Sequence, residues 1–114
     1  MIIVAGHLDF ADRTDRDTVI AASADLQQAT LDESGCLAYA FTPDPCLGAR
    51  VCIYELWEDE ESLAAHFQHP NYRAMRDALR LGERVATDVQ KFRCDVAEPV
   101  YDDTHTPRAD FFTL

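Results

Sequence analysis

Two side chains between positions 55 and 66, Glu55 and His66, have the types needed to transfer a proton near neutral pH, and Trp57 lies between them in the sequence. Glu55 and Trp57 are two residues apart in a stretch typical of a strand, so both lie on the same face of it. For a carboxyl group that lies next to an indole we expect a raised pKa, which would suit the group to proton transfer. His66 follows in an expected helix, and the pKa of a free imidazole is about 6.5. We therefore predict that Glu55 and His66 are catalytic and that Trp57 stacks on an aromatic substrate.

Each of these side chains also has a purely structural interpretation. His66 could brace its helix against a strand through a hydrogen bond. Glu55 could form an ion pair with an arginine such as Arg73 or Arg76. Trp57, the only tryptophan in the chain, could belong to the hydrophobic core. The sequence leaves these alternatives open.

Further residues are candidates for binding a substrate. Tyr72 and Arg73 open an expected helix, where they could orient an oxyanion. His7 lies on the opposite alternation of the first strand from Leu8, and it is a candidate to reach a pocket. We predict that these three residues bind the substrate together with Trp57.

The elements that must position these side chains follow from the spacing of apolar residues. Strands are predicted at residues 2–10, 36–42, 51–57 and 87–96, and helices at 15–33, at 59–67 and from 70 until the pattern fades near 82. This order is the split βαββαβ unit of the ferredoxin-like α+β fold, with a four-stranded antiparallel sheet. Tyr39 and Phe41 share a strand face with Leu37. The first helix carries an apolar stripe that we expect to be buried, made of Val19, Ala22, Leu26 and Ala29.

Both faces of several strands carry large apolar groups, so a monomer would expose one set of them to water. Two sheets packed face to face would bury that set, and we therefore predict a homodimer. The domain is expected to cover residues 1–98, followed by a C-terminal tail at 99–114. The tail ends in an apolar cluster at 111–114, which is either a frayed end or a segment docked on its own or the partner subunit.

The charge and the motifs exclude several classes of protein. The chain of 114 residues has 21 acidic and 10 basic side chains and a net charge of -11, a field that repels nucleic acid and anionic membrane surfaces. No apolar run approaches the ~20 residues of a membrane span, and the N-terminus lacks the basic region of a signal peptide, which favours a cytoplasmic protein. No glycine-rich motif for a nucleotide or a flavin is present.

The cysteine and histidine spacing gives no metal site. The four cysteines contain no Cys-x-x-Cys pair, and we expect free thiols. His66 and His69 are three residues apart, but Pro70 interrupts the helix between them and no third ligand follows, so no metal is predicted.

The sequence of residues 54–66, YELWEDEESLAAH, resembles the signature of the antibiotic biosynthesis monooxygenase family. The shared pattern is a strand that ends in Glu-x-Trp, an acidic helix start, and then Leu-x-x-His. His69, Pro70 and Tyr72 fall where relatives carry a short break and a second helix. With the order of elements, the resemblance covers residues 1–98. It implies a dimeric α+β barrel with a pocket between sheet and helices in each subunit.

The resemblance also implies an activity, which is cofactor-independent oxygenation of an electron-rich aromatic such as a quinol or a polyketide phenol. Removing a phenol proton makes the substrate a better electron donor to molecular oxygen, so such a site needs a base, a dry pocket and groups that hold the anion. Alternatives are isomerisation of a small metabolite and non-catalytic ligand binding. Haem degradation is less favoured. Relatives that degrade haem use an Asn on the first strand, near the position where this chain has His7. They also use a Trp, and the only Trp of this chain is Trp57 on the third strand.

Overall fold

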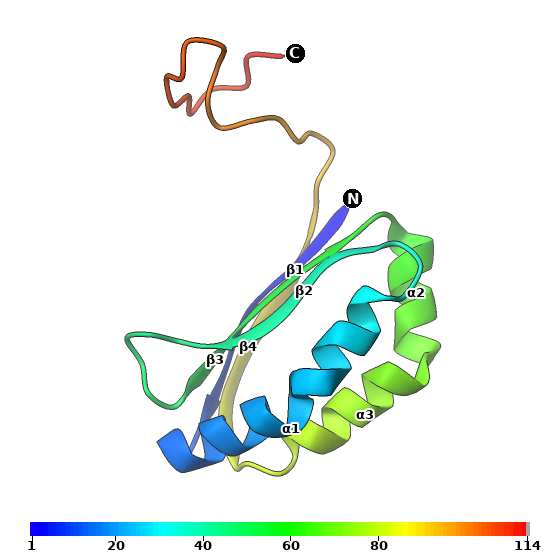
Figure 1. Cartoon of the computed structure of the whole chain (residues 1–114), viewed down its shortest axis with the longest axis vertical. Helices are drawn as coiled ribbons and strands as arrows, with labels where there is room; N and C mark the ends of the chain where they lie inside the picture. Colours follow the sequence, from blue (N-terminus) through cyan, green and yellow to red (C-terminus); the bar gives the residue numbers. More distant parts are fainter. Residues whose placement is uncertain (114) are drawn as a thin grey trace.

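A computed structural model describes residues 1–113 of the chain. The strands form one antiparallel sheet in the order β2-β3-β1-β4. The helices lie together on one face of this sheet (Figure 1). The arrangement is the predicted ferredoxin-like βαββαβ unit. Its elements are β1 (Ile2–Phe10), α1 (Arg13–Leu31), β2 (Cys36–Pro43), β3 (Arg50–Trp57), α2 (Glu60–Gln68), α3 (Pro70–Leu79) and β4 (Arg84–Arg93).

The helix starts are set by side-chain oxygens and by one proline. The carboxylate of Asp12 accepts the backbone N–H of Asp15 at 2.8 Å, and α1 begins immediately after Asp12. Asp59 accepts the N–H of Ser62 at 2.7 Å at the start of α2. Pro70 opens α3, where its missing N–H costs no hydrogen bond.

The buried face of α1 differs from the predicted apolar stripe. Val19 is buried as expected, but Ala22 is exposed, and the small polar residues Ser23 and Thr30 are buried in its place. The Ser23 hydroxyl donates to the carbonyl of Ile20 at 3.1 Å. Because its hydrogen bond is made within the helix, this side chain can be buried against the sheet. Apolar periodicity alone does not detect such positions.

A bulge at the start of β2 changes the face on which Leu37 lies. The pairing of β2 with β3 shifts register between Cys36 and Ala38, so an extra residue is inserted at this point. Tyr39 and Phe41 share a buried face under the helices, whereas Leu37, predicted to share that face with them, is 53% exposed. The strict alternation assumed for this strand is therefore wrong at its first residues.

The last strand begins and ends three residues earlier than predicted, because it must pair with β1. Ile2 lies opposite Arg93 and Phe10 lies opposite Arg84, which fixes both ends of β4. The N–H of Cys94 still donates to the carbonyl of Met1 at 2.8 Å, and the chain then leaves the sheet.

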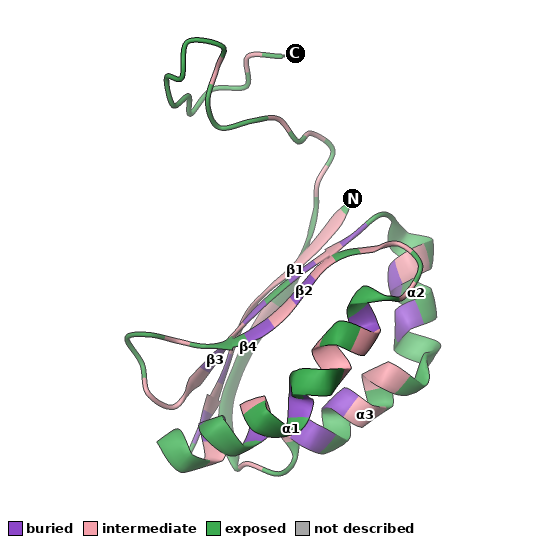
Figure 2. Cartoon of the chain, viewed as in Figure 1, coloured by how far each residue is buried: buried purple, intermediate pink, exposed green. Residues whose placement is uncertain are grey.

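The C-terminal tail after β4 projects away from the domain (Figure 1) and is mostly exposed (Figure 2). The carboxylate of Glu98 accepts the backbone N–H groups of Phe112 and Thr113, each at 2.8 Å. The guanidinium of Arg108 lies over the ring of Phe112 at 5.2 Å. The apolar cluster predicted at 111–114 thus folds back on the tail itself as far as residue 113, and Leu114 lies outside the described residues.

The two faces of the sheet have different roles. The core lies between the sheet and the helices, where Leu8, Val51 and Trp57 are buried (Figure 2). On the opposite face, Tyr54 is 45% exposed and Phe92 is 49% exposed. One chain therefore leaves large aromatic side chains of its sheet in contact with water. No helix in residues 1–113 is long and apolar enough to cross a membrane.

Candidate active site

A cavity of about 420 Å³ lies between the sheet and the two short helices. Helix α1 packs mainly on β2, so the space beside α3 and over β1 and β4 stays open. The walls are largely apolar, with Leu8 and Ile53 from the sheet and Met75 from α3. The volume is in the range of sites for small organic ligands. Two of the predicted catalytic residues, Glu55 and His66, are among the side chains that line it.

Glu55 is a buried acid in the wall of this cavity, with 7% of its surface exposed. Its Oε1 accepts the indole N–H of Trp57 at 2.9 Å. Burial raises the pKa of Glu55 to about 7, against the opposing effect of the Trp57 hydrogen bond and with a further contribution from the charge of Glu33. Within residues 1–113 no arginine forms an ion pair with it. The carboxyl group can therefore take up or release a proton near neutral pH.

The raised pKa of Glu55 makes the stability of the fold depend on pH. The folded chain holds this proton to about pH 7, whereas the group's ordinary pKa is 4.5. The contribution of the protonated Glu55 to the free energy of unfolding is fully present below pH 4.5 and is lost as the pH rises through 7. We expect the free energy of unfolding of the wild type, relative to Glu55→Gln, to fall by about 3 kcal/mol over this interval. Urea unfolding of both proteins at several pH values checks this, and parallel pH profiles would contradict it.

Trp57 lies behind the cavity wall, with none of its surface exposed. Its ring stacks on the imidazole of His66 with 4.6 Å between centroids and 33° between planes. The indole is not among the groups that line the cavity. It contacts the two candidate catalytic side chains on the side away from the cavity, through the hydrogen bond to Glu55 and the packing on His66.

His66 is held by a carboxylate from the end of the first helix. Its Nδ1 lies 3.0 Å from Oε1 and 3.2 Å from Oε2 of Glu33. The side chain of Asn71 donates to the same Oε2 at 3.1 Å. Because a carboxylate only accepts hydrogen bonds, Nδ1 carries a proton, and in the neutral imidazole the lone pair is therefore on Nε2. Nε2 forms no hydrogen bond within residues 1–113, and His66 lines the cavity, so the imidazole is oriented as a base.

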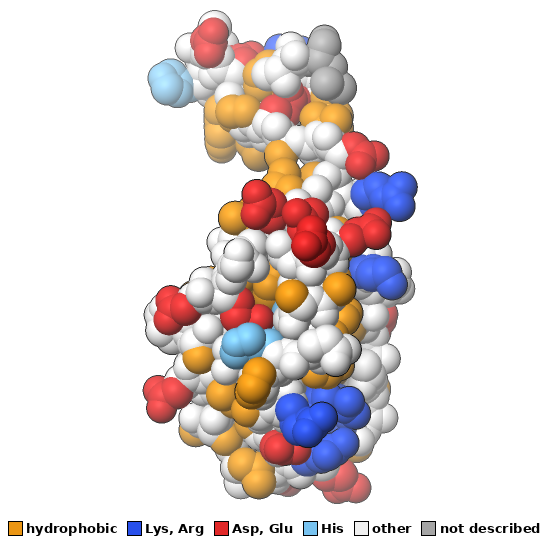
Figure 3. All heavy atoms as spheres, turned by 90° about the vertical axis from the view of Figure 1, so that its right-hand side faces the viewer, with side chains coloured by type: hydrophobic (Ala, Val, Ile, Leu, Met, Phe, Trp, Pro, Cys, Tyr) orange, Lys and Arg blue, Asp and Glu red, His pale blue; other side chains and the backbone are white. Residues whose placement is uncertain are grey.

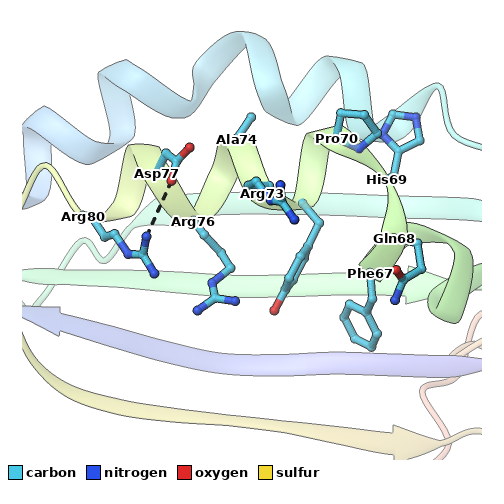
Figure 4. A pocket seen from close by; sticks show the side chains of 10 residues that line it. Phe67, Gln68, His69, Pro70, Arg73, Ala74, Arg76, Asp77 and Arg80 are labelled. Carbon is cyan, nitrogen blue, oxygen red and sulfur yellow. Dashed lines mark ion pairs between the residues drawn. The ribbon is translucent and has the colours of Figure 1, made fainter.

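The other predicted binding residues fall in different places. Tyr72 lines the cavity, with its ring edge-on to His66 at 5.5 Å. Arg73 lies outside the cavity, in a groove along α3 where basic side chains gather on the surface (Figures 3 and 4). His7 lies on the opposite face of the sheet, where its Nε2 is 4.0 Å from a carboxylate oxygen of Asp9. Of the six predicted site residues, the structure brings Glu55, Trp57, His66 and Tyr72 together and leaves Arg73 and His7 apart.

Several residues of this site carried no signal in the sequence. Glu33 is separated by 33 positions from His66, and it appeared only as the last residue before a helix stop at Ser34. Tyr39 was predicted as a strand residue, but its ring lines the cavity. Burial, with the charges of nearby carboxylates, raises the pKa of Tyr39, so its hydroxyl stays protonated and can donate a hydrogen bond. Within residues 1–113 no group of three or more His, Cys, Asp or Glu side chains is arranged to hold a metal ion.

Comparisons with known proteins agree with this fold. A protein of Deinococcus radiodurans assigned to the antibiotic biosynthesis monooxygenases superposes with a TM-score of 0.77 at 22% identity, over 90% of this chain and 100% of that one. A conserved protein of Methanosarcina mazei gives 0.71 at 21% identity, over 81% and 90%. A Bacteroides thetaiotaomicron protein of unknown function, named as a possible oxidoreductase, gives 0.67 at 26% identity, over 80% and 95%. No curated protein matches the sequence.

The class of protein follows from these observations, which define a ferredoxin-like α+β domain with a cavity between its sheet and its helices. The sequence profile described as antibiotic biosynthesis monooxygenase matches residues 1–78. The chain belongs to this family, as the signature at residues 54–66 predicts.

Proposed function

We propose that this protein is a cofactor-independent monooxygenase that oxidises a small phenolic or quinol-like aromatic with molecular oxygen. The observation that carries the proposal is the pair of proton-transfer groups, Glu55 and His66, in the wall of a largely apolar cavity. Membership of the antibiotic biosynthesis monooxygenase family supports the same reaction class.

In this proposal His66 is the base that removes the phenol proton. Glu33 holds Nδ1 and so directs the lone pair of Nε2 to the substrate, and it stabilises the imidazolium that forms. Tyr39, whose hydroxyl stays protonated, and Tyr72 both line the cavity and are the candidate hydrogen-bond donors to the phenolate oxygen. The apolar lining keeps water away from the anion and the oxygen adduct.

The electrons and atoms balance without a further reactant. The phenolate transfers one electron to molecular oxygen, and the resulting radical pair joins at a ring carbon to give a peroxide. His66 returns its proton to this peroxide. Glu55 takes the proton of the ring C–H as the O–O bond breaks and then releases it to the departing hydroxide. The products are a quinone and one water molecule, with Glu55 working near its pKa of about 7.

The test is oxygen consumption by the purified chain with a panel of phenols and quinols. We expect substrate-dependent uptake of one oxygen molecule per quinone formed, and no quinone under nitrogen. Turnover of a carbonyl substrate that persists without oxygen would instead favour an isomerase that uses the same acid–base pair. Saturable binding with unchanged aromatic recovered afterwards would favour a ligand-binding protein and contradict the proposed oxygenase.

The proposal includes a homodimer in which the two sheets pack face to face. The face of the sheet away from the helices carries Ile3 on β1, Tyr54 and Leu56 on β3, and Phe92 on β4. Both β3 and β4 pair with β1, so these side chains lie on adjacent strands. Burying such a face is worth about 25 cal/mol per Å². We expect a dimer by sedimentation at micromolar concentration and a monomer for Tyr54→Glu/Phe92→Glu. A wild-type monomer at that concentration would contradict this part of the proposal.

A further inference from the structure

We propose that the substrate of this cavity is an aromatic carboxylate, with its ring inside and its carboxylate held at the mouth by Arg76, Arg80 and Arg84. The inference rests on the proposed function for the chemistry of the ring, but it adds an anion-binding subsite. The guanidinium groups that form it come from Arg76 on α3, from Arg80 directly after the end of α3, and from Arg84, the first residue of β4.

The position of these arginines identifies the mouth of the cavity. Arg76 and Arg80 line both the cavity and the surface groove along α3, so they stand where the two join. Figure 4 shows the side chains of Arg76, on α3, and of Arg80, directly after its end, extending over the strands of the sheet. Arg84, exposed at the start of β4, lines the cavity from the sheet.

The charge of this subsite is opposite to that of the chain. The sequence has 10 basic and 21 acidic side chains, yet three arginines line this cavity, and Glu55 is the only carboxylate that lines it among residues 1–113. Basic side chains also gather visibly on the face that carries α2 and α3 (Figure 3). A local positive field in a molecule of net charge -11 attracts a small anion to this place and not to the rest of the surface.

These arginines are available for a ligand. Within residues 1–113 neither Arg76 nor Arg84 has a carboxylate within 4.0 Å, and Arg76 lies 5.8 Å from the centre of the Tyr72 ring. Arg80 is 3.7 Å from Asp77, but both side chains are more than half exposed, so this pair gives way at little cost. A guanidinium matches a planar carboxylate through two parallel hydrogen bonds. The cavity behind is apolar and aromatic, which suits a ring attached to that carboxylate.

The test compares binding of 1-hydroxy-2-naphthoate with that of its methyl ester by calorimetry under nitrogen, where no oxidation occurs. We expect the carboxylate to bind about tenfold more tightly than the ester, and Arg76→Gln/Arg84→Gln to lose about tenfold for the carboxylate only. Arg13→Gln/Arg93→Gln removes the same two charges from exposed positions outside the cavity and should change binding less than about twofold.

Equal affinity for acid and ester, an equal loss in both double variants, or no saturable binding of either compound would overturn the inference. Because these measurements need no oxygen, they stay separate from the test of the oxygenase. Acid-selective binding without turnover would support the subsite and contradict the oxygenase. Turnover of the ester as efficient as that of the acid would support the oxygenase and contradict the anion-binding subsite.

Discussion

Replacing His66 with alanine should lower kcat/KM for the aromatic substrate by about 10²–10⁴-fold, the usual contribution of a positioned general base. His66 is 2% exposed, lines the cavity and has its Nδ1 fixed by Glu33. Glu33→Gln keeps the size of the orienting group but removes its charge, so we expect a smaller fall in kcat/KM, of about 10–100-fold. Steady-state oxygen uptake measures both variants.

A structural role for His66 can be separated from a chemical one. Removing the imidazole opens space beside the cavity, and added imidazole should restore part of the rate of His66→Ala. His69→Asn is a matched control, because His69 is partly exposed and an asparagine can still accept the N–H of Asn71 at the start of α3. Rate loss without rescue, in step with a lower melting temperature, would show that His66 only braces the fold.

Replacing Trp57 with alanine should destabilise the domain by about 3–5 kcal/mol, the range for a large buried aromatic. Its indole is fully buried between β3 and His66. Trp57→Phe fills most of the same space and should cost clearly less, but it removes the N–H donor to Glu55. Since that hydrogen bond lowers the pKa of Glu55, the pKa should rise above 7 in Trp57→Phe.

Two measurements check this prediction. Urea unfolding gives the stability of both variants, and the acid limb of the kcat/KM profile should move to higher pH in Trp57→Phe. An alanine variant as stable as the wild type would mean that the indole is not part of the core. An unchanged pH profile in the phenylalanine variant would mean that Glu55 does not titrate in the reaction.

Much of the fold could be predicted because local chemistry determines it. Asp12, Asp59 and Pro70 start three helices at or within two residues of the predicted positions, and alternation in β3 correctly places Glu55 and Trp57 on one face. The errors arise where tertiary contacts outweigh local pattern. Pairing with β1 sets the ends of β4, and the bulge before Ala38 turns Leu37 to solvent.

The site could be predicted only where its residues are close in sequence. Glu55 and Trp57 share a strand face, and the helix with His66 follows directly, so their proximity is encoded locally. Glu33 reaches His66 only because α1 ends beside α2, and no spacing rule connects positions that far apart. The side of the sheet on which His7 lies is set by which face the helices cover, and that is a property of the whole fold.

The proposed proton-transfer groups and the proposed anion-binding groups of this site differ in how deeply they are buried. Glu33, Glu55 and His66 are buried in the packed interior, so most changes there also disturb folding. The arginines along α3 and at the start of β4 are exposed, and substitutions at such positions usually change stability by less than about 0.5 kcal/mol. In the proposed function, substitutions of these arginines would therefore change which substrates bind with little effect on the stability of the domain, and a designer could alter substrate preference at these surface positions alone.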